Sequence, residues 1–200
     1  MSYTDIELAD NPVAYYPLNE ASGLIANDLA NKKNAAYSGN ITYGVTGPNG
    51  DTGVTLNSGA QLILPASLGI PAFAALTIVF WVKTSLDSDW HPVGLTCDGF
   101  TSTLYVDGDV SAGSKGATVT FTGLFDYIST MDNSSFMRLG IFNKVLPPAA
   151  FANRFRAGGG VRETTVHGPG IVLGVPKGWA NVVLDSQGQS VLRTTSIAGG

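Results

Sequence analysis

The feature that most constrains this chain is a block of three strand-like runs joined by short turns, between residues 76 and 108. The first run, Leu76–Lys83, has the sequence LTIVFWVK, and the second, His91–Cys97, has the sequence HPVGLTC. The third, Phe100–Val106, lies between the dipeptides Asp98-Gly99 and Asp107-Gly108. Alternating apolar and polar residues are typical of half-buried antiparallel strands, and Asp-Gly is typical of tight turns. The block therefore predicts an antiparallel β-sheet, and it indicates architecture more than chemistry.

The composition agrees with an all-β fold. The chain has 200 residues, of which 25 are glycines and 13% are charged, against about 25% charged residues in a typical globular domain. The low charge has two interpretations: part of the surface is buried against another chain, or the surface is simply rich in Thr, Ser and Asn. A chain of this length can form one β-sandwich with an appendage.

Several classes of protein are excluded by charge and composition. The net charge is −4, and the closest approach to a basic cluster is Arg154, Arg156 and Arg162, so we expect no nucleic-acid partner. A single cysteine, Cys97, allows no intrachain disulfide, and we expect it to be a buried, inert thiol. No apolar run is long enough to span a membrane. The start of the sequence, MSYTDIE, lacks the features of a signal peptide, so we expect synthesis in a cytoplasm.

Further strands and one helix are expected on either side of the block. Residues 146–157 predict a short helix, with Pro147 and Pro148 in its first turn and an apolar stripe at spacings of three and four. Residues 4–9 predict a capped helical turn. The remaining strand-like segments are 13–18, 35–37, 41–45, 53–56, 61–65, 117–121 and 136–143.

The glycine run 158–160 predicts a boundary between two regions, 1–158 and 159–200. The second region is β-rich, with strand-like segments at 171–175, 181–185 and 190–195, but has few large apolar side chains and is a poor independent core. We expect it to pack on the sandwich, on a partner or on copies of itself. Trp179 is the candidate anchor, either in a partner's pocket or on its own sandwich. The other candidate interface residues are Ile171, Val172, Leu173, Val183 and Leu192.

No constellation of catalytic residues is found. Asp107 and Asp109 have a spacing that a glycosidase could use, but Asp-Gly-Asp better predicts a hairpin tip. His91 is expected to hydrogen-bond a loop, and His167 has no second ligand nearby. Nucleophile and phosphate-binding motifs are absent. We therefore predict no enzyme, no catalytic residue and no cofactor.

Aromatic residues could stack on sugars. Trp81 lies in an apolar run and is expected in the core, whereas Trp90 begins a strand after a polar turn and is expected to be half exposed. Trp90, His91 and Tyr105 are the candidate carbohydrate-binding residues.

Five sequence segments, taken in order, resemble a known family. They are 11–23 (NPVAYYPLNEASG), 77–84 (TIVFWVKT), 90–93 (WHPV), 104–108 (LYVDG) and 140–146 (GIFNKVL). Together they resemble the laminin-G-like, concanavalin A-like jelly rolls of virion proteins from bacteriophages that infect actinobacteria. The resemblance covers roughly residues 1–158 and implies an antiparallel β-sandwich of jelly-roll type.

The chain departs from that family in two places. Only Thr84–Asp89 separates two strands that usually have further strands between them, which implies a truncated sandwich. Calcium-binding members carry acidic or Asn residues in an early loop, which Asn27, Asp28 and Asn31 fit, but Met137 and Arg138 stand where a second carboxylate is expected. Since Ca²⁺ needs six to eight oxygen ligands, we predict no metal site, with Asn27 and Asp28 as the residual calcium candidates.

The resemblance implies a structural component of a bacteriophage virion, and we expect a minor tail protein. The C-terminal extension would pair strands with neighbouring chains, in a homo-oligomer for which a trimer is one candidate. The expected partners are other virion proteins. Two alternatives remain open: an adhesin that binds host cell-surface glycan, and a decoration protein on the capsid.

Overall fold

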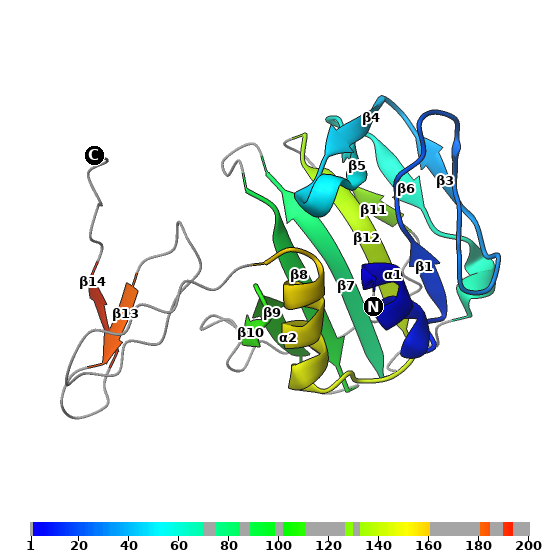
Figure 1. Ribbon diagram of the computed structural model, residues 1–200. Helices are drawn as coiled ribbons and strands as arrows, with labels where there is room; N and C mark the ends of the chain where they lie inside the picture. The colour runs from blue at the N-terminus through cyan, green and yellow to red at the C-terminus, as the bar shows by residue number, and fades with distance from the viewer. Residues whose placement is uncertain are drawn as a thin grey trace, which may run out of the picture. The chain divides into compact units, whose positions relative to one another are not determined.

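Two antiparallel β-sheets pack face to face in the N-terminal part of the chain (Figure 1). The computed structural model describes residues 2–69, 75–84, 89–98, 102–110, 127–129 and 133–160, and the backbone of 181–184 and 190–193. The chain divides into two compact units, Met1–Gly159 and Gly160–Gly200.

Among the described residues, the larger sheet has eight strands. Seven follow the order β10-β9-β8-β7-β12-β5-β4, and β1 pairs with β12 beside them. β7 and β8 form a hairpin whose register runs from the Leu76–Cys97 pair to the Val82–His91 pair. The strands are β1 Ala14–Tyr16, β4 Ile41–Thr46, β5 Thr52–Leu56, β7 Leu76–Lys83, β8 His91–Cys97, β9 Ser102–Val106, β10 Asp109–Val110 and β12 Ser135–Phe142.

The smaller sheet has the order β11-β6-β3-β2 in the described part of the chain. Its strands are β2 Ile25–Ala26, β3 Ala35–Ser38, β6 Gln61–Ile63 and β11 Tyr127–Ser129. Two 3₁₀ turns, η1 Pro48–Gly50 and η2 Ala66–Leu68, connect strands, and two α-helices, α1 Tyr3–Ala9 and α2 Pro148–Ala157, complete the unit.

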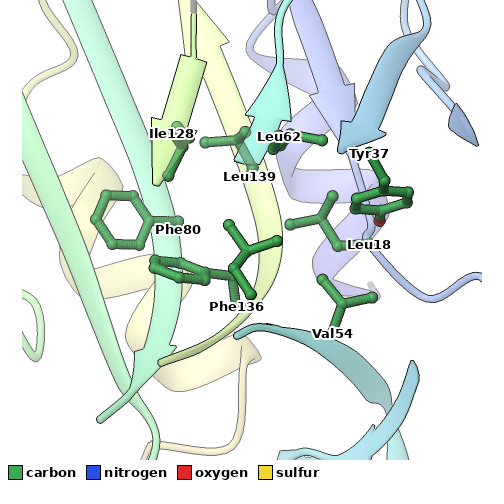
Figure 2. Close-up of a pocket in the computed structure, with 9 residues that line it drawn as sticks. Leu18, Tyr37, Val54, Leu62, Phe80, Ile128, Phe136 and Leu139 are labelled. Atoms are coloured by element: carbon green, nitrogen blue, oxygen red, sulfur yellow. The ribbon is translucent and has the colours of Figure 1, made fainter. Parts of the chain in front are cut away.

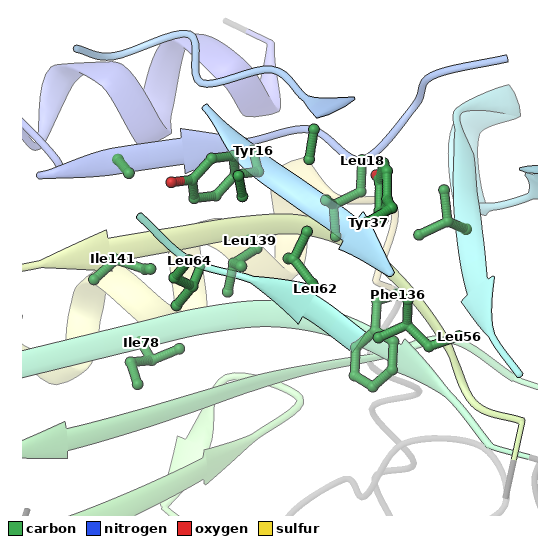
Figure 3. Packing of buried hydrophobic residues seen from close by; sticks show 14 of the residues in the cluster. Tyr16, Leu18, Tyr37, Leu56, Leu62, Leu64, Ile78, Phe136, Leu139 and Ile141 are labelled. Atoms are coloured by element: carbon green, nitrogen blue, oxygen red, sulfur yellow. The ribbon is translucent and has the colours of Figure 1, made fainter. Parts of the chain in front are cut away.

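The main core lies between the two sheets (Figure 3). Alternation along β7 turns Ile78 toward the smaller sheet, where it joins a cluster with Leu62 of β6 and Ile141 of β12. Each fully buried aliphatic or aromatic side chain of this kind stabilises the fold by about 1.5–3 kcal/mol. The strand pattern of the sequence is thus explained by a sandwich with one face of each sheet turned inward.

β12 is central and is buried along all eight residues. Its register with β7 shifts between Met137 and Gly140, and Arg138 within this β-bulge has φ of +57°. A bulge of this kind breaks the alternation of side chains, so Met137 and Arg138 both contact the residues on the outer face of the larger sheet.

Both helices cover that outer face (Figure 1). α1 begins with a capping box in which the Ser2 hydroxyl accepts from the Asp5 N–H and the Asp5 carboxylate accepts from the Ser2 N–H. α2 begins after Pro147, with Pro148 as its first residue. Proline is tolerated at this end of a helix because the first N–H groups have no hydrogen-bond acceptor within the helix. The two helices are joined by a buried ion pair between Glu7 and Arg154.

The predicted fold class, an all-β antiparallel sandwich of the jelly-roll, lectin-like type, is confirmed. The prediction of a single short helix is wrong, because residues 3–9 also form a complete α-helix, stabilised by its capping box. Cys97 is buried, as expected. The predicted strands at 117–121 and 171–175 lie outside the described residues. No helix in the described part of the chain is both long and apolar enough to cross a membrane.

In the C-terminal unit, β13 Asn181–Leu184 and β14 Ser190–Arg193 pair as an antiparallel ribbon. Val183 pairs with Val191, and Leu192 pairs with Val182. The other candidate interface residues, Trp179, Ile171, Val172 and Leu173, lie outside the described residues, so their proposed role stays a prediction.

Candidate functional site

The space between the two sheets is core rather than a ligand cavity. Figure 2 shows apolar side chains from both sheets, among them Leu62, Phe80 and Phe136, converging on it. The unfilled volume is about 10 Å³, close to the minimum for a single water molecule. The described space between the two sheets therefore leaves no room for a ligand larger than a water molecule.

Tyr105, predicted to contact carbohydrate, is a packing residue. Its ring stacks on Phe151 of α2, with centroids 3.9 Å apart and planes at 6°. The stack covers Gly94, and Tyr105 is 6% exposed. Because Phe151 of α2 covers one face of the ring, Tyr105 has little surface for a sugar, and its role in carbohydrate binding stays a prediction.

Trp90 and His91 also make structural contacts. The Trp90 indole N–H donates to the Thr46 carbonyl at 3.0 Å, and the half-buried ring packs near Met137. His91 Nδ1 lies 3.0 Å from a carboxylate oxygen of Asp107, at the β9–β10 turn. Tyr105 pairs with Gly94 on the neighbouring strand β8. Trp90 precedes Gly94 by four residues, which is about 13 Å along an extended strand. The role of Trp90 and His91 in carbohydrate binding therefore stays a prediction.

The expected hairpin tip is found at Asp107 and Gly108. Both have positive φ, +53° and +82°, and Val106 pairs directly with Asp109 across the turn. This is the geometry of a two-residue hairpin turn that favours Asp-Gly. Asp107 accordingly lies within the turn and Asp109 directly follows it, instead of the two facing each other across a cleft.

Asp28, a residual calcium candidate, is occupied by the protein backbone. Oδ1 accepts from the N–H groups of Tyr15 and Ala30 at 2.8 and 2.9 Å, and Oδ2 accepts from those of Asn31 and Lys33 at 3.0 and 2.9 Å. A carboxylate has about four lone-pair sites, so none is left for a cation. The neighbouring Asn27 donates from its side chain to Glu20. The structure therefore gives Asp28 the role of closing a loop.

The candidate site is a polar hollow of about 300 Å³ between α1, η1 and the bulge of β12. We call it the Arg138 hollow. Its polar lining comes from Thr4, Tyr15, Asn19, Asp51, Thr52 and Arg138.

Arg138 fixes the electrostatics of this hollow. Its guanidinium is nearly buried, lies 4.5 Å from the ring centroid of Tyr3 and 5.3 Å from that of Trp81, and donates to the Gly158 carbonyl at 3.2 Å. Its Nε and Nη2 both donate to Asp51 Oδ2. Asp51 itself is half exposed. The buried cation thus holds an acceptor at the edge of the hollow and balances its charge.

The other lining groups are neutral. The Tyr15 hydroxyl lies 3.4 Å from the Thr4 hydroxyl, and burial raises the pKa of Tyr15 to about 12, so this hydroxyl stays protonated at neutral pH. Asn19 is exposed, and its side chain makes no hydrogen bond within the described residues. The hollow therefore presents a carboxylate, an amide and hydroxyl groups, which together can both donate and accept.

The sequence pattern alone assigns no role to this site. In the sequence, Arg138 argues only against calcium, and Asp51 indicates only a turn. A signal was present, because an arginine in the apolar strand SFMRLGIF requires a partner once it is buried. The partner could not be inferred, since Asp51 lies 87 residues earlier in the chain.

Within the described residues, no group of three or more His, Cys, Asp or Glu side chains is arranged to hold a metal ion.

The two packed antiparallel sheets define the fold of the N-terminal unit as a β-sandwich. No protein-family model matches the chain, and no curated protein sequence matches it. Among solved structures, a mutant of Trypanosoma rangeli sialidase with trans-sialidase activity matches with a TM-score of 0.54 and 15% identity. The match covers 72% of this chain and 32% of the sialidase chain.

Two botulinum neurotoxin structures are similar to the chain to the same degree. The binding domain of serotype G matches with a TM-score of 0.53 and 10% identity over 73% of this chain and 51% of that chain. A structure of botulinum neurotoxin type C, whose cell entry depends on interaction with two ganglioside molecules, matches with a TM-score of 0.51 and 12% identity. This match covers 78% of this chain and 53% of that chain. The chain thus spans about a third to a half of these proteins, and the likeness concerns the fold alone.

Proposed function

We propose that the chain is a non-enzymatic, lectin-like domain that binds neutral glycan in the Arg138 hollow. The observation that carries this proposal is the Asp51 carboxylate, held by a buried guanidinium at the edge of a hollow lined by an amide and hydroxyl groups.

The chemistry of this hollow suits a sugar. Sugar hydroxyls donate to carboxylates and accept from amides and hydroxyls, and the lining offers all three kinds of group. The charge of Asp51 is balanced by Arg138, so the hollow does not favour an ionic ligand. A volume of about 300 Å³ lies at the lower end of the range of small-molecule sites, which suits a single sugar unit.

The structural neighbours support a binding function at the level of the fold. One of the neurotoxin structures is titled for interaction with gangliosides, which carry carbohydrate. The sialidases among the neighbours are enzymes, but Asp107 and His91, the residues of this chain with the nearest resemblance to catalytic groups, hold a hairpin turn.

We place this domain on a bacteriophage virion, as a minor tail protein whose sandwich contacts a host-surface glycan. The order of the sequence segments 11–23, 77–84, 90–93, 104–108 and 140–146 supports this setting. The C-terminal extension would assemble the chain with neighbouring copies, with a trimer as the candidate, and with other virion proteins. A decoration protein on the capsid is the alternative, and locating the chain on intact particles by electron microscopy decides between the two.

The binding function is tested by screening the purified full chain on an array of neutral bacterial and animal glycans, followed by calorimetric titration of the best ligand. Asn19→Ala and Asp51→Asn should each weaken that ligand about fivefold to tenfold, because each removes a hydrogen bond worth about 1 kcal/mol. Asp51→Asn keeps an acceptor for Arg138 and is expected to stay folded.

Asn40→Ala is the matched control, since Asn40 is an exposed asparagine outside the hollow. Its affinity should equal that of the wild type. Absence of binding to every glycan on the array, or equal losses in the Asn40 and Asn19 variants, would contradict the proposal.

A further inference from the structure

A second hollow, of about 770 Å³, borders the C-terminal end of α1 and has one lysine in its lining. We call it the Lys33 hollow. The residues that matter for its chemistry are Asn11, Val13, Leu29, Asn31, Lys33 and Asn143. Lys33 is the one charged residue in its described lining, which contains no carboxylate.

The Lys33 ammonium is available to a ligand. Lys33 is half-buried, and within the described residues its side chain makes no ion pair and no hydrogen bond. The chain as a whole has a net charge of −4. An unpaired, partly desolvated cation on an acidic chain is a local site for an anion.

Three asparagines line the same hollow as Lys33. Asn31 Nδ2 donates to the carbonyls of Pro12 and Val13, each at 3.0 Å, which fixes the amide and leaves its oxygen as an acceptor. Asn11 and Asn143 are exposed, and their side chains make no hydrogen bond among the described residues. These amides can both donate and accept.

The positions of Asn31 and Lys33 are set in advance by the Asp28 loop. The N–H groups of both residues donate to Asp28 Oδ2, and the Tyr16 hydroxyl donates to the Lys33 carbonyl at 2.6 Å. Asp28 is 5% exposed and Tyr16 is fully buried. Because the loop is held from two buried side chains, little ordering is needed when a ligand binds.

Apolar groups complete the lining. Leu29 is 51% exposed, although it is a large aliphatic side chain, and half-buried Val13 also lines the hollow. Apolar surface beside amides and one cation matches a ligand with an apolar ring face, hydroxyl or amide groups and one negative charge.

We propose that the Lys33 hollow binds an acidic saccharide. Its carboxylate pairs with the Lys33 ammonium, its hydroxyl or N-acyl groups bond the asparagine amides, and its ring face lies on Leu29 and Val13. This goes beyond the proposed function, since it concerns a separate hollow and a charged ligand, and it does not depend on the Arg138 hollow.

The experiment titrates the full chain with two acidic probes, oligogalacturonate and an oligosaccharide of alternating glucuronate and N-acetylglucosamine, and with the methyl ester of each. The wild type should bind at least one acidic probe. It should bind the neutral methyl ester of that probe more weakly, by about tenfold or more. Lys33→Gln should lose about tenfold in affinity for the acidic probe, because it removes a charge-assisted hydrogen bond. Lys33→Arg should retain most of that affinity.

Lys32→Gln is the matched control, because Lys32 is the adjacent lysine and does not line the hollow. Lys32→Gln should leave the affinity for the acidic probe unchanged. Asn19→Ala, in the Arg138 hollow, should also leave the affinity for the acidic probe unchanged, whether or not the Arg138 hollow binds neutral glycan. Thermal unfolding confirms that each variant is folded. The proposal is overturned if neither acidic probe binds at millimolar concentration, if the esters bind equally well, or if Lys32→Gln and Lys33→Gln lose the same affinity.

Discussion

At the scale of single residues, the most consequential contact outside the hollows is the ion pair between Glu7 and Arg154. Arg154 Nε and Nη2 donate to the two Glu7 oxygens at 2.8 and 3.2 Å, and Nη2 also donates to Asp10 at 2.8 Å. Glu7 and Arg154 are 0% and 2% exposed. Burial raises the pKa of Glu7, and the charge of Arg154 opposes this rise.

Replacing Arg154 with methionine should destabilise the protein by about 3–5 kcal/mol at pH 7, because it leaves a buried carboxylate without its partner. The pKa of Glu7 in the folded variant should rise further above its ordinary value of 4.5. A carboxyl with a raised folded pKa stabilises the fold below its unfolded pKa and loses this contribution as the pH rises through the folded pKa. The free energy of unfolding, measured in urea, should therefore fall more steeply between pH 4 and pH 8 than in the wild type.

Arg156→Met is the control, since Arg156 lies on the same helix and is exposed. It should change the free energy of unfolding by less than about 0.5 kcal/mol. The double variant Glu7→Gln/Arg154→Met should lose the steep pH dependence. If Arg154→Met lowers the free energy of unfolding by the same amount at every pH, this account of Glu7 is contradicted.

At the scale of secondary-structure elements, α2 approaches the larger sheet closely at Gly94. Phe151 lies over Gly94 of β8 and stacks on Tyr105 of β9. A Cβ at position 94 would lie 2.2 Å from Phe151 Cε1. The absence of a side chain at this position is what allows the helix to dock.

Gly94→Ala should therefore destabilise the protein by about 1–3 kcal/mol through overpacking, as measured by thermal or urea unfolding. A smaller residue on the helix should relieve part of this cost, so the effects of Gly94→Ala and Phe151→Leu should be less than additive. Glycan binding should be unchanged in both variants. Additive losses would show that the two positions do not share this contact.

The sequence predicted those elements whose pattern is local. The apolar run Leu76–Lys83 and the Asp107-Gly108 dipeptide led to a correct strand and a correct hairpin turn, whereas the expected Asp98-Gly99 turn lies partly outside the described residues. The Ser2–Asp5 cap explains why residues 3–9 go beyond a single turn. It did not predict features that join distant segments. The stack of Tyr105 on Phe151, the pairing of Arg138 with Asp51 and the backbone bonds to Asp28 depend on the packing of strands and helices, which no local pattern encodes.

At the scale of the whole molecule, the chain divides into Met1–Gly159 and Gly160–Gly200. The first unit contains both sheets, both helices and both hollows. In the described part of the second unit, two strands form a ribbon, and a two-stranded ribbon is marginally stable by itself. Different roles for the two units, binding and assembly, are consistent with this division.

A chain that ends at Gly159 should therefore fold, with the thermal unfolding midpoint and the glycan affinity of the full chain. If the extension assembles copies, light scattering should show an oligomer for the full chain and a monomer for the shortened one. An unfolded shortened chain would contradict the independence of the first unit. An unchanged oligomer would show that assembly resides in the sandwich.

The Asp28 loop has a consequence for how such a domain can evolve. Four backbone N–H groups meet one carboxylate, so inserting or deleting a residue between Asp28 and Lys33 would remove several of these bonds at once. Replacing the side chain at position 29, 31 or 33 leaves the backbone bonds in place. Relatives that bind different ligands should thus keep the length of this loop and keep Asp28. They should differ by substitutions at the outward-facing positions of the loop.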